Sequence, residues 1–196
     1  HIPFCDEMCS FCRCYTKVVK RYDPVADYLE VLLSEIDLVA QALPSRFKAS
    51  NLHWGGGSPT MLKGSDWKRI IERLFKRFDI TDNATIAVEL DPRTASIEYV
   101  KALSDAGVNR ASIGVQSFDA DIQKAINRIQ PYEMTAKVIP NRVSGLVVKH
   151  LIFFTGKFPS ISKLISHPKD LPIQFFCIIF TLFGQLSRLS SPSNKS

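Results

Sequence analysis

The sequence predicts an α/β protein in which parallel strands alternate with helices. Apolar residues recur at helical spacing, short apolar runs follow each such segment, and glycine or proline stands where one pattern changes to the next. Strands that alternate with helices form parallel βα units, which build either an open sheet or a barrel. The 196 residues, 45% hydrophobic and 22% charged, have ordinary globular usage and provide for one domain with a substantial core.

The first helix is expected to begin at Asp23-Pro24, because an N-cap residue is followed there by proline at the first helical position. Its apolar stripe consists of Val25, Leu29, Leu32, Leu33, Ile36 and Val39. A short apolar run over residues 51–54 predicts a buried strand, and the glycines at 55–57 predict a turn directly after it. This segment therefore places a glycine loop at the end of a strand.

The same pattern is repeated twice further along the chain. Ser65 is the expected N-cap of a second helix, whose apolar stripe runs from Trp67 to Phe78. Gly107 is expected to end a third helix. The other expected elements are a strand over 85–90, the third helix over 96–106, a strand over 110–115 and a short helix over 119–127. Polar residues gather just after the strands, where barrel active sites are built.

The charge divides the chain into two parts. Residues 1–139 carry 18 basic and 18 acidic residues, whereas residues 140–196 carry seven basic residues and one acid, Asp170. We therefore expect a folded core over 1–139 and an unrelated basic and apolar tail over 140–196. The basic residues between 68 and 77 are expected to form a solvated helix face, so no nucleic-acid partner is expected. The apolar run at 171–184 is shorter than the roughly 20 residues of a membrane span, so no membrane partner is expected.

Four cysteines lie close together near the start of the chain, at positions 5, 9, 12 and 14. Such clustering favours metal binding in a reducing compartment over a disulfide scaffold. The spacing of Cys5, Cys9 and Cys12 puts three soft thiolates on one loop, and such ligands select iron–sulfur clusters or zinc. Three ligands leave one iron of a four-iron cluster open to a small molecule. The alternative is a structural zinc ion with Cys14 as fourth ligand, although the second, distant pair usual in such sites is absent.

The segment from His1 to Cys14 resembles the cluster loop of the oxygen-independent coproporphyrinogen III dehydrogenase family, radical S-adenosylmethionine (SAM) enzymes of haem synthesis. Three later segments are similar to further motifs of that family, in matching order and spacing: 53–60 to its SAM loop, 89–93 to its acidic strand end, and 114–116 with 127–130 to its later motifs. The resemblance covers residues 1–139 and implies an incomplete (β/α) radical-SAM barrel. The related haem chaperones typically lack the cysteine at Cys14 and the His-Trp before the glycines.

The resemblance implies a role for each matching residue. Cys5, Cys9 and Cys12 would bind a [4Fe–4S] cluster, while Cys14 is present in the family without being a ligand. Gly56 matches a position that contacts the cluster-bound SAM, as does the carboxylate at position 89. That carboxylate is Glu89. Contacts to a second SAM molecule are implied for Phe11, Gly57, Ser58, Gln116 and Arg128.

The resemblance also implies an activity. A SAM-derived 5′-deoxyadenosyl radical would oxidatively decarboxylate coproporphyrinogen III to protoporphyrinogen IX, with a porphyrinogen substrate and an electron donor as partners. A cytoplasmic location is expected, or an organellar one in a eukaryote. The alternative is a non-catalytic iron–sulfur or haem-binding relative of the haem-chaperone kind.

This chain departs from the family after residue 139. The family continues with a helix and a strand bearing an aspartate for the second SAM, and ungapped spacing puts that position near Phe153. We expect no equivalent strand in this chain, and we therefore expect the chain to be a fragment of such an enzyme.

Overall fold

A four-stranded parallel sheet forms the centre of the fold. The computed structural model describes residues 1–139 and 146–152. Its strands follow one another in chain order: β3 (Lys48–Trp54), β4 (Asp79–Leu90), β5 (Arg110–Gly114) and β6 (Val147–Ile152). Each neighbouring pair is parallel. Because the order never reverses, the sheet has the winding of a barrel and lacks the switch point of a doubly wound sheet.

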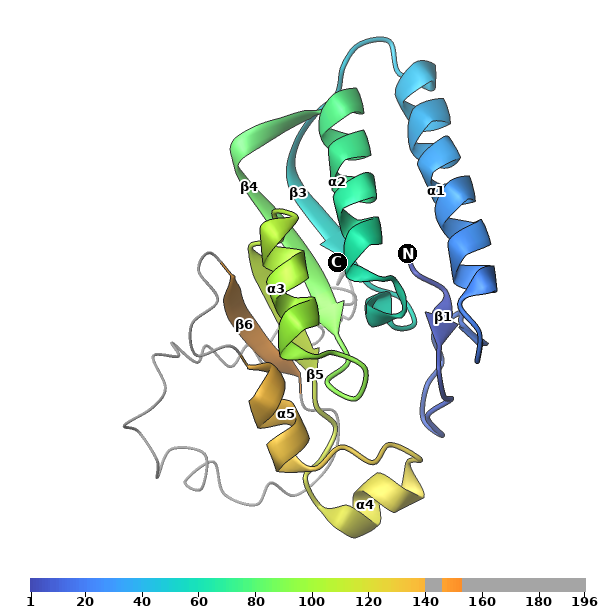
Figure 1. Cartoon of the computed structure of the whole chain (residues 1–196), viewed down its shortest axis with the longest axis vertical. Coiled ribbons are helices and arrows are strands. Elements are labelled where there is room, and N and C mark those ends of the chain that lie inside the picture. The colour runs from blue at the N-terminus through green and yellow to red at the C-terminus, as the bar shows by residue number, and fades with distance from the viewer. Residues whose placement is uncertain (140–145, 153–196) are drawn as a thin grey trace, which may run out of the picture.

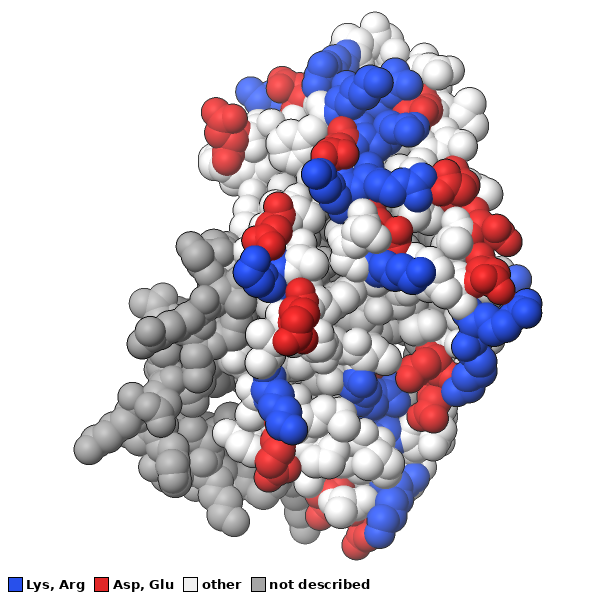
Figure 2. All heavy atoms as spheres, viewed as in Figure 1, with Lys and Arg blue, Asp and Glu red and all other residues white. Residues whose placement is uncertain are grey.

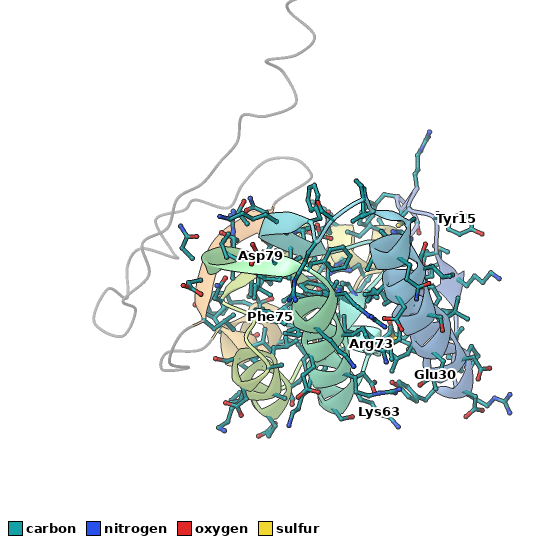
Figure 3. The ribbon with its side chains drawn as sticks, turned by 90° about the horizontal axis from the view of Figure 1, so that it is seen from above. Tyr15, Glu30, Lys63, Arg73, Phe75 and Asp79 are labelled. Carbon is teal, nitrogen blue, oxygen red and sulfur yellow. The ribbon has the colours of Figure 1, made fainter. Side chains whose placement is uncertain are left out.

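The long helices cover one face of this sheet. Figure 1 shows α1 (Asp23–Ala42), α2 (Gly64–Arg77) and α3 (Ile97–Asp105) in a row in front of the strands, and the view from above in Figure 3 shows the same layer. Two short helices, α4 (Ala120–Ala125) and α5 (Tyr132–Val138), connect β5 to β6. The expected α/β class is confirmed, in the form of part of a barrel.

The core lies between the sheet and the helices. Trp67 of α2 is completely buried and packs edge-on against Trp54 of β3, with ring centroids 5.3 Å apart. Its indole N–H donates a 2.7 Å hydrogen bond to the hydroxyl of Tyr99 on α3. The strands send alternate residues to opposite faces, so that Val88 enters this core while Glu89 lines a cavity.

Ion pairs join α1 to α2. Asp37 of α1 accepts hydrogen bonds from Arg73, at 2.5 Å, and from Arg77, at 2.7 Å. Arg69 makes a 2.7 Å contact to Glu30. The basic residues that gather over these helices in Figure 2 therefore have acidic partners among them. The hydrogen bond from Arg77 is the main cause that lowers the pKa of Asp37.

The helix ends agree with the sequence except at two N-caps. Asp23 is the first residue of α1 and Tyr22 is its N-cap. Ser96 caps α3 by accepting from the backbone N–H of Tyr99, and Gly107 follows that helix at φ 103°. Ser65 is not the N-cap of α2, because the helix begins at Gly64, two positions earlier than expected, with Lys63 as its N-cap. The side chain of Asp66, at the third helical position, accepts the Lys63 backbone N–H at 2.8 Å, which is the half of a capping box that runs from the helix back to the N-cap residue.

Strands β3 and β4 begin earlier than their apolar runs predicted, because pairing extends to Lys48 and Asp79. The expectation that no strand follows residue 139 is wrong. Strand β6 pairs with β5 from Arg110 opposite Val147 to Gly114 opposite Ile152. The composition changes at 140, but the unpaired edge of β5 still accepts a strand there.

Helix α5 was also not predicted. Phe153 and the apolar run at 171–184 lie outside the described residues. The division of the chain at residue 139 stays a prediction.

Candidate functional site

A cavity of about 450 Å³ lies where β3, β4 and β5 end. The cysteine loop closes one side of it, and residues that follow the three strands form the other. This is the end of the sheet at which barrel enzymes bind their substrates. All ten residues expected to bind the cluster or SAM line this cavity: Cys5, Cys9, Phe11, Cys12, Gly56, Gly57, Ser58, Glu89, Gln116 and Arg128.

Backbone hydrogen bonds hold the cysteine loop on the glycine loop. Ile2 donates to Gly55 at 2.9 Å and accepts from Gly57 at 2.8 Å, and Ser58 donates to Phe4 at 2.7 Å. Ile2 and Phe4 are buried in the core, which fixes the position of the chain that leads into the cysteines. Two segments more than 50 residues apart are thereby placed side by side.

The cysteine loop is closed by a short parallel pairing of β1 (Phe4–Cys5) with β2 (Lys17–Val18). The glycine loop leads into the 3-10 turn η1 (Pro59–Met61). Both loops are thus bounded by regular backbone hydrogen bonding.

Two glycines are required by this close approach. A Cβ at Gly57 would lie 2.5 Å from the Thr16 hydroxyl and 2.6 Å from the Phe4 carbonyl oxygen. Gly56 has φ 124°, and a Cβ there would lie 2.6 Å from the His1 ring. A side chain at either position would separate the two loops.

The thiols of Cys5 and Cys12 each receive a hydrogen bond. The Thr16 hydroxyl donates to Cys5 Sγ at 3.4 Å, and the Cys14 backbone N–H donates to Cys12 Sγ at 3.5 Å. Burial is the main cause that raises the pKa of both the Cys5 and the Cys14 thiol. A metal that binds Cys5 must therefore displace a proton.

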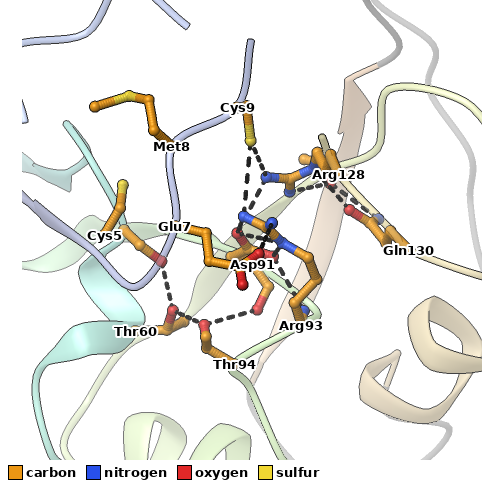
Figure 4. A network of polar contacts seen from close by, with 12 residues as sticks. Cys5, Glu7, Met8, Cys9, Thr60, Asp91, Arg93, Thr94, Arg128 and Gln130 are labelled. Carbon is orange, nitrogen blue, oxygen red and sulfur yellow. Dashed lines mark hydrogen bonds and ion pairs between the residues drawn. The ribbon is translucent and has the colours of Figure 1, made fainter. Parts of the chain in front are cut away.

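Two arginines donate to the third thiol. Arg93 Nη2 lies 3.8 Å and Arg128 Nη1 3.7 Å from Cys9 Sγ. Both guanidiniums also contact the carboxylate of Asp91, at 2.7 and 3.1 Å, and Figure 4 shows them side by side above it. Burial raises the pKa of Asp91, but hydrogen bonds from Arg93 and the charges of both arginines outweigh it and lower that pKa below its usual value.

Arg128 makes further hydrogen bonds that fix its orientation. It donates to the Gly114 carbonyl oxygen at 3.1 Å and to Gln130 Oε1 at 2.9 Å. Arg128 was an expected site residue, whereas no role was predicted for Asp91 or Arg93. Their signal was available, since a charged pair directly follows the end of β4.

Glu89 lies over the glycine loop. A Cβ at Gly55 would approach Glu89 Oε2 to 2.9 Å. Glu89 Oε1 lies 3.2 Å from Nε2 of His53, which comes from the neighbouring strand. His53 belongs to the 53–60 segment that resembles a SAM loop, but it was not among the expected site residues.

The donor set fits a [4Fe–4S] cluster with SAM. Three soft thiolates face one cavity and each has a hydrogen-bond donor, the arrangement that tunes iron–sulfur ligands. Gln116 Oε1 is buried in the cavity wall without a hydrogen-bond partner and can accept from a ligand. Within residues 1–139 and 146–152, no three His, Cys, Asp or Glu side chains meet closely enough to hold a single metal ion.

The fold and the site define an iron–sulfur protein built on part of a barrel. The profile of the radical SAM superfamily matches residues 1–145, and the chain belongs to that superfamily. A [4Fe–4S] cluster and SAM are the cofactors of this superfamily, as the resemblance implied.

Individual relatives carry the name that the resemblance suggested. The oxygen-independent coproporphyrinogen III oxidase of Bradyrhizobium diazoefficiens is 47% identical over 139 residues, which cover 71% of this chain and 31% of that protein. The Escherichia coli enzyme of the same name is 40% identical over 134 residues, covering 68% and 29%. The solved structure of the Escherichia coli coproporphyrinogen III oxidase, described as a radical SAM enzyme, superposes with a TM-score of 0.68 at 32% identity, covering 76% of this chain and 35% of that one. The chain thus spans about a third of the length of these relatives.

No helix in the described part of the chain is long and apolar enough to cross a membrane.

Proposed function

We propose that this chain carries the cluster-binding and SAM-binding part of an enzyme that oxidatively decarboxylates coproporphyrinogen III to protoporphyrinogen IX. The observation that carries the proposal is the meeting of all ten expected site residues around one cavity. The names of the relatives support the substrate. The enzyme works in the cytoplasm and needs a porphyrinogen and an electron donor as partners.

Cys5, Cys9 and Cys12 hold the [4Fe–4S] cluster, and Cys14 supplies a backbone N–H to one of its ligands. When bound, the cluster and SAM supply a one-electron cleavage that yields a 5′-deoxyadenosyl radical able to take a hydrogen atom from a substrate propionate. The propionate then loses carbon dioxide and one electron, which an acceptor removes, and a vinyl group remains.

The chain's own residues orient SAM and exclude water. Backbone at Gly56 and Gly57 allows close approach, and the Glu89 carboxylate accepts hydrogen bonds from ammonium or hydroxyl groups. Phe11, Ser58, Gln116 and Arg128 contribute the remaining contacts around the cavity, including those to a second SAM.

Anaerobic reconstitution with iron and sulfide tests this function. The chain should bind about four irons and show the broad absorption of thiolate-ligated clusters. Addition of dithionite and SAM should then release 5′-deoxyadenosine. A colourless protein that binds one zinc ion would exclude both the cluster and the enzyme.

A non-catalytic, haem-binding relative is the second candidate, and the same experiment separates it from the enzyme. It would assemble the cluster but release no 5′-deoxyadenosine. His53 and Cys14, which the haem chaperones typically lack, both lie at the site and favour the enzyme.

A further inference from the structure

Arg93 is a buried arginine at the cavity to which neither the motifs nor the proposed function assigns a role. Its side chain is 10% exposed. Nη2 lies 2.7 Å from Asp91 Oδ2 and 3.8 Å from Cys9 Sγ, and Nη1 lies 4.0 Å from Glu7. Figure 4 shows the guanidinium between the Asp91 carboxylate and the Cys9 thiol.

We propose that Arg93 is a positioning residue that acts through the Cys9 thiolate to stabilise the reduced state of the bound [4Fe–4S] cluster. The inference rests on the proposed function, because it requires Cys9 to be a cluster ligand. It assigns to Arg93 control over how readily the cluster accepts the electron that SAM cleavage needs.

The physical reason is the charge added on reduction. One electron increases the negative charge on the cluster and its thiolates, and a cation in a buried site stabilises that charge more strongly than it would in water. Hydrogen bonds to cluster sulfurs and the net charge nearby are among the factors that set the potential of such clusters. Arg93 supplies both a donor and a positive charge at one sulfur.

Asp91 fixes this cation in place. Its carboxylate contacts both Arg93 and Arg128, so two guanidiniums share one buried negative charge beside Cys9. Arg128 is oriented by Gly114 and Gln130 in addition, whereas the charged partners of Arg93 are Asp91 and Glu7. Among the buried groups of this network, two guanidiniums face one carboxylate, which leaves a net positive charge close to the sulfur, whereas the Glu7 side chain is 55% exposed to water.

A purely structural role for the Asp91–Arg93 pair is the competing explanation. The pair joins the end of β4 to the cysteine loop, and its loss would lower stability under either explanation. Only the proposed role changes the potential of an assembled cluster, and only that role predicts opposite shifts for removal of the cation and removal of the anion.

The test compares variants of the 196-residue chain after anaerobic reconstitution. The midpoint potential is measured by redox titration, with the electron paramagnetic resonance signal of the reduced cluster as readout. R93Q should lower the reduced-to-oxidised ratio about tenfold at a fixed potential, which is about 59 mV for one electron. R93K keeps the charge and should show a smaller negative shift, whereas D91N should shift the potential upward.

R73Q is the matched control, because Arg73 is also paired with a carboxylate but lies on α2 outside the cavity lining. Its cluster should keep the wild-type potential. An unchanged potential in R93Q with an intact cluster overturns the inference while the proposed function stands. If R93Q assembles no cluster, unchanged potentials in both R93K and D91N overturn it. If the unsubstituted chain binds no cluster, the proposed function fails first and the inference with it.

Discussion

The side-chain amide of Asn127 donates a 2.8 Å hydrogen bond to the backbone carbonyl oxygen of Met8, 119 residues earlier in the chain. Asn127 has φ 50°, and a second bond, from the Ser10 N–H to the Ile126 carbonyl, lies beside it. The turn after α4 therefore holds the cysteine loop, and the left-handed conformation of Asn127 aims its amide at that loop.

Two substitutions at Asn127 should separate the contribution of its backbone conformation to stability from the contribution of its hydrogen bond. N127G keeps the backbone conformation and should lose about 1 kcal/mol of unfolding free energy from the missing bond. N127A loses the same bond and adds the roughly 1 kcal/mol cost of a left-handed non-glycine residue. Urea denaturation measures both, and equal losses would show that the turn relaxes freely.

The close approach of Gly57 to the Phe4 carbonyl predicts that a side chain at position 57 lowers the stability of the chain. G57A should destabilise the chain by about 1–3 kcal/mol, because its Cβ must push the cysteine loop away. Gly114 is the control, since a Cβ there would meet Arg128 at an ordinary 3.6 Å. G57A should also lower iron uptake on reconstitution, and equal stability of G57A and G114A would contradict the close approach of the two loops.

Cys14 tests the ligand assignment. It is exposed, and its contribution to Cys12 comes from backbone N–H, which serine retains. C14S should therefore bind about four irons like the unsubstituted chain, whereas C12S should lose most of them. Iron and acid-labile sulfide analysis measures both. Equal loss in C14S and C12S would favour a site with four protein ligands, such as the zinc alternative.

Local patterns predicted most of the fold, whereas the resemblance to a known family named the ten residues that line the cavity. Helical spacing in α1, the Ser96 cap and the glycine after α3 depend on residues a few positions apart. The structure confirms them, except that Val39 at the end of the α1 stripe is exposed. The glycine loop and the cysteine loop were also local features, and their meeting followed from the resemblance to a known family.

Contacts between distant residues could not be predicted in this way. Arg93 reaches Cys9 across 84 positions, and no local pattern contains both residues. Strand β6 depends on the free edge of β5, whereas the sequence was divided by the change in composition at residue 140. Ser65 was expected to cap α2 from residue type alone, but the helix begins two positions earlier than expected, with Lys63 as its N-cap.

The ion pairs of Asp37 predict how stability depends on pH. Arg77 and Arg73 lower its pKa in the folded chain below the usual 3.8. A lowered folded-state pKa contributes stability that is fully present above the unfolded value and is lost as pH falls through the folded value. The contribution of Asp37 should therefore be complete at pH 7 and disappear well below pH 3.8.

D37N removes this contribution at every pH. The difference in unfolding free energy between the unsubstituted chain and D37N should be largest near neutral pH and should shrink as the pH falls below 3.8, as measured by urea denaturation across that range. D105N is the control, because Asp105 pairs with Lys101 at the surface with both side chains more than 60% exposed. Such a pair contributes little, so D105N should stay close to the unsubstituted chain throughout. A D37N difference that stays constant down to pH 2 would show that these arginines do not stabilise the Asp37 carboxylate.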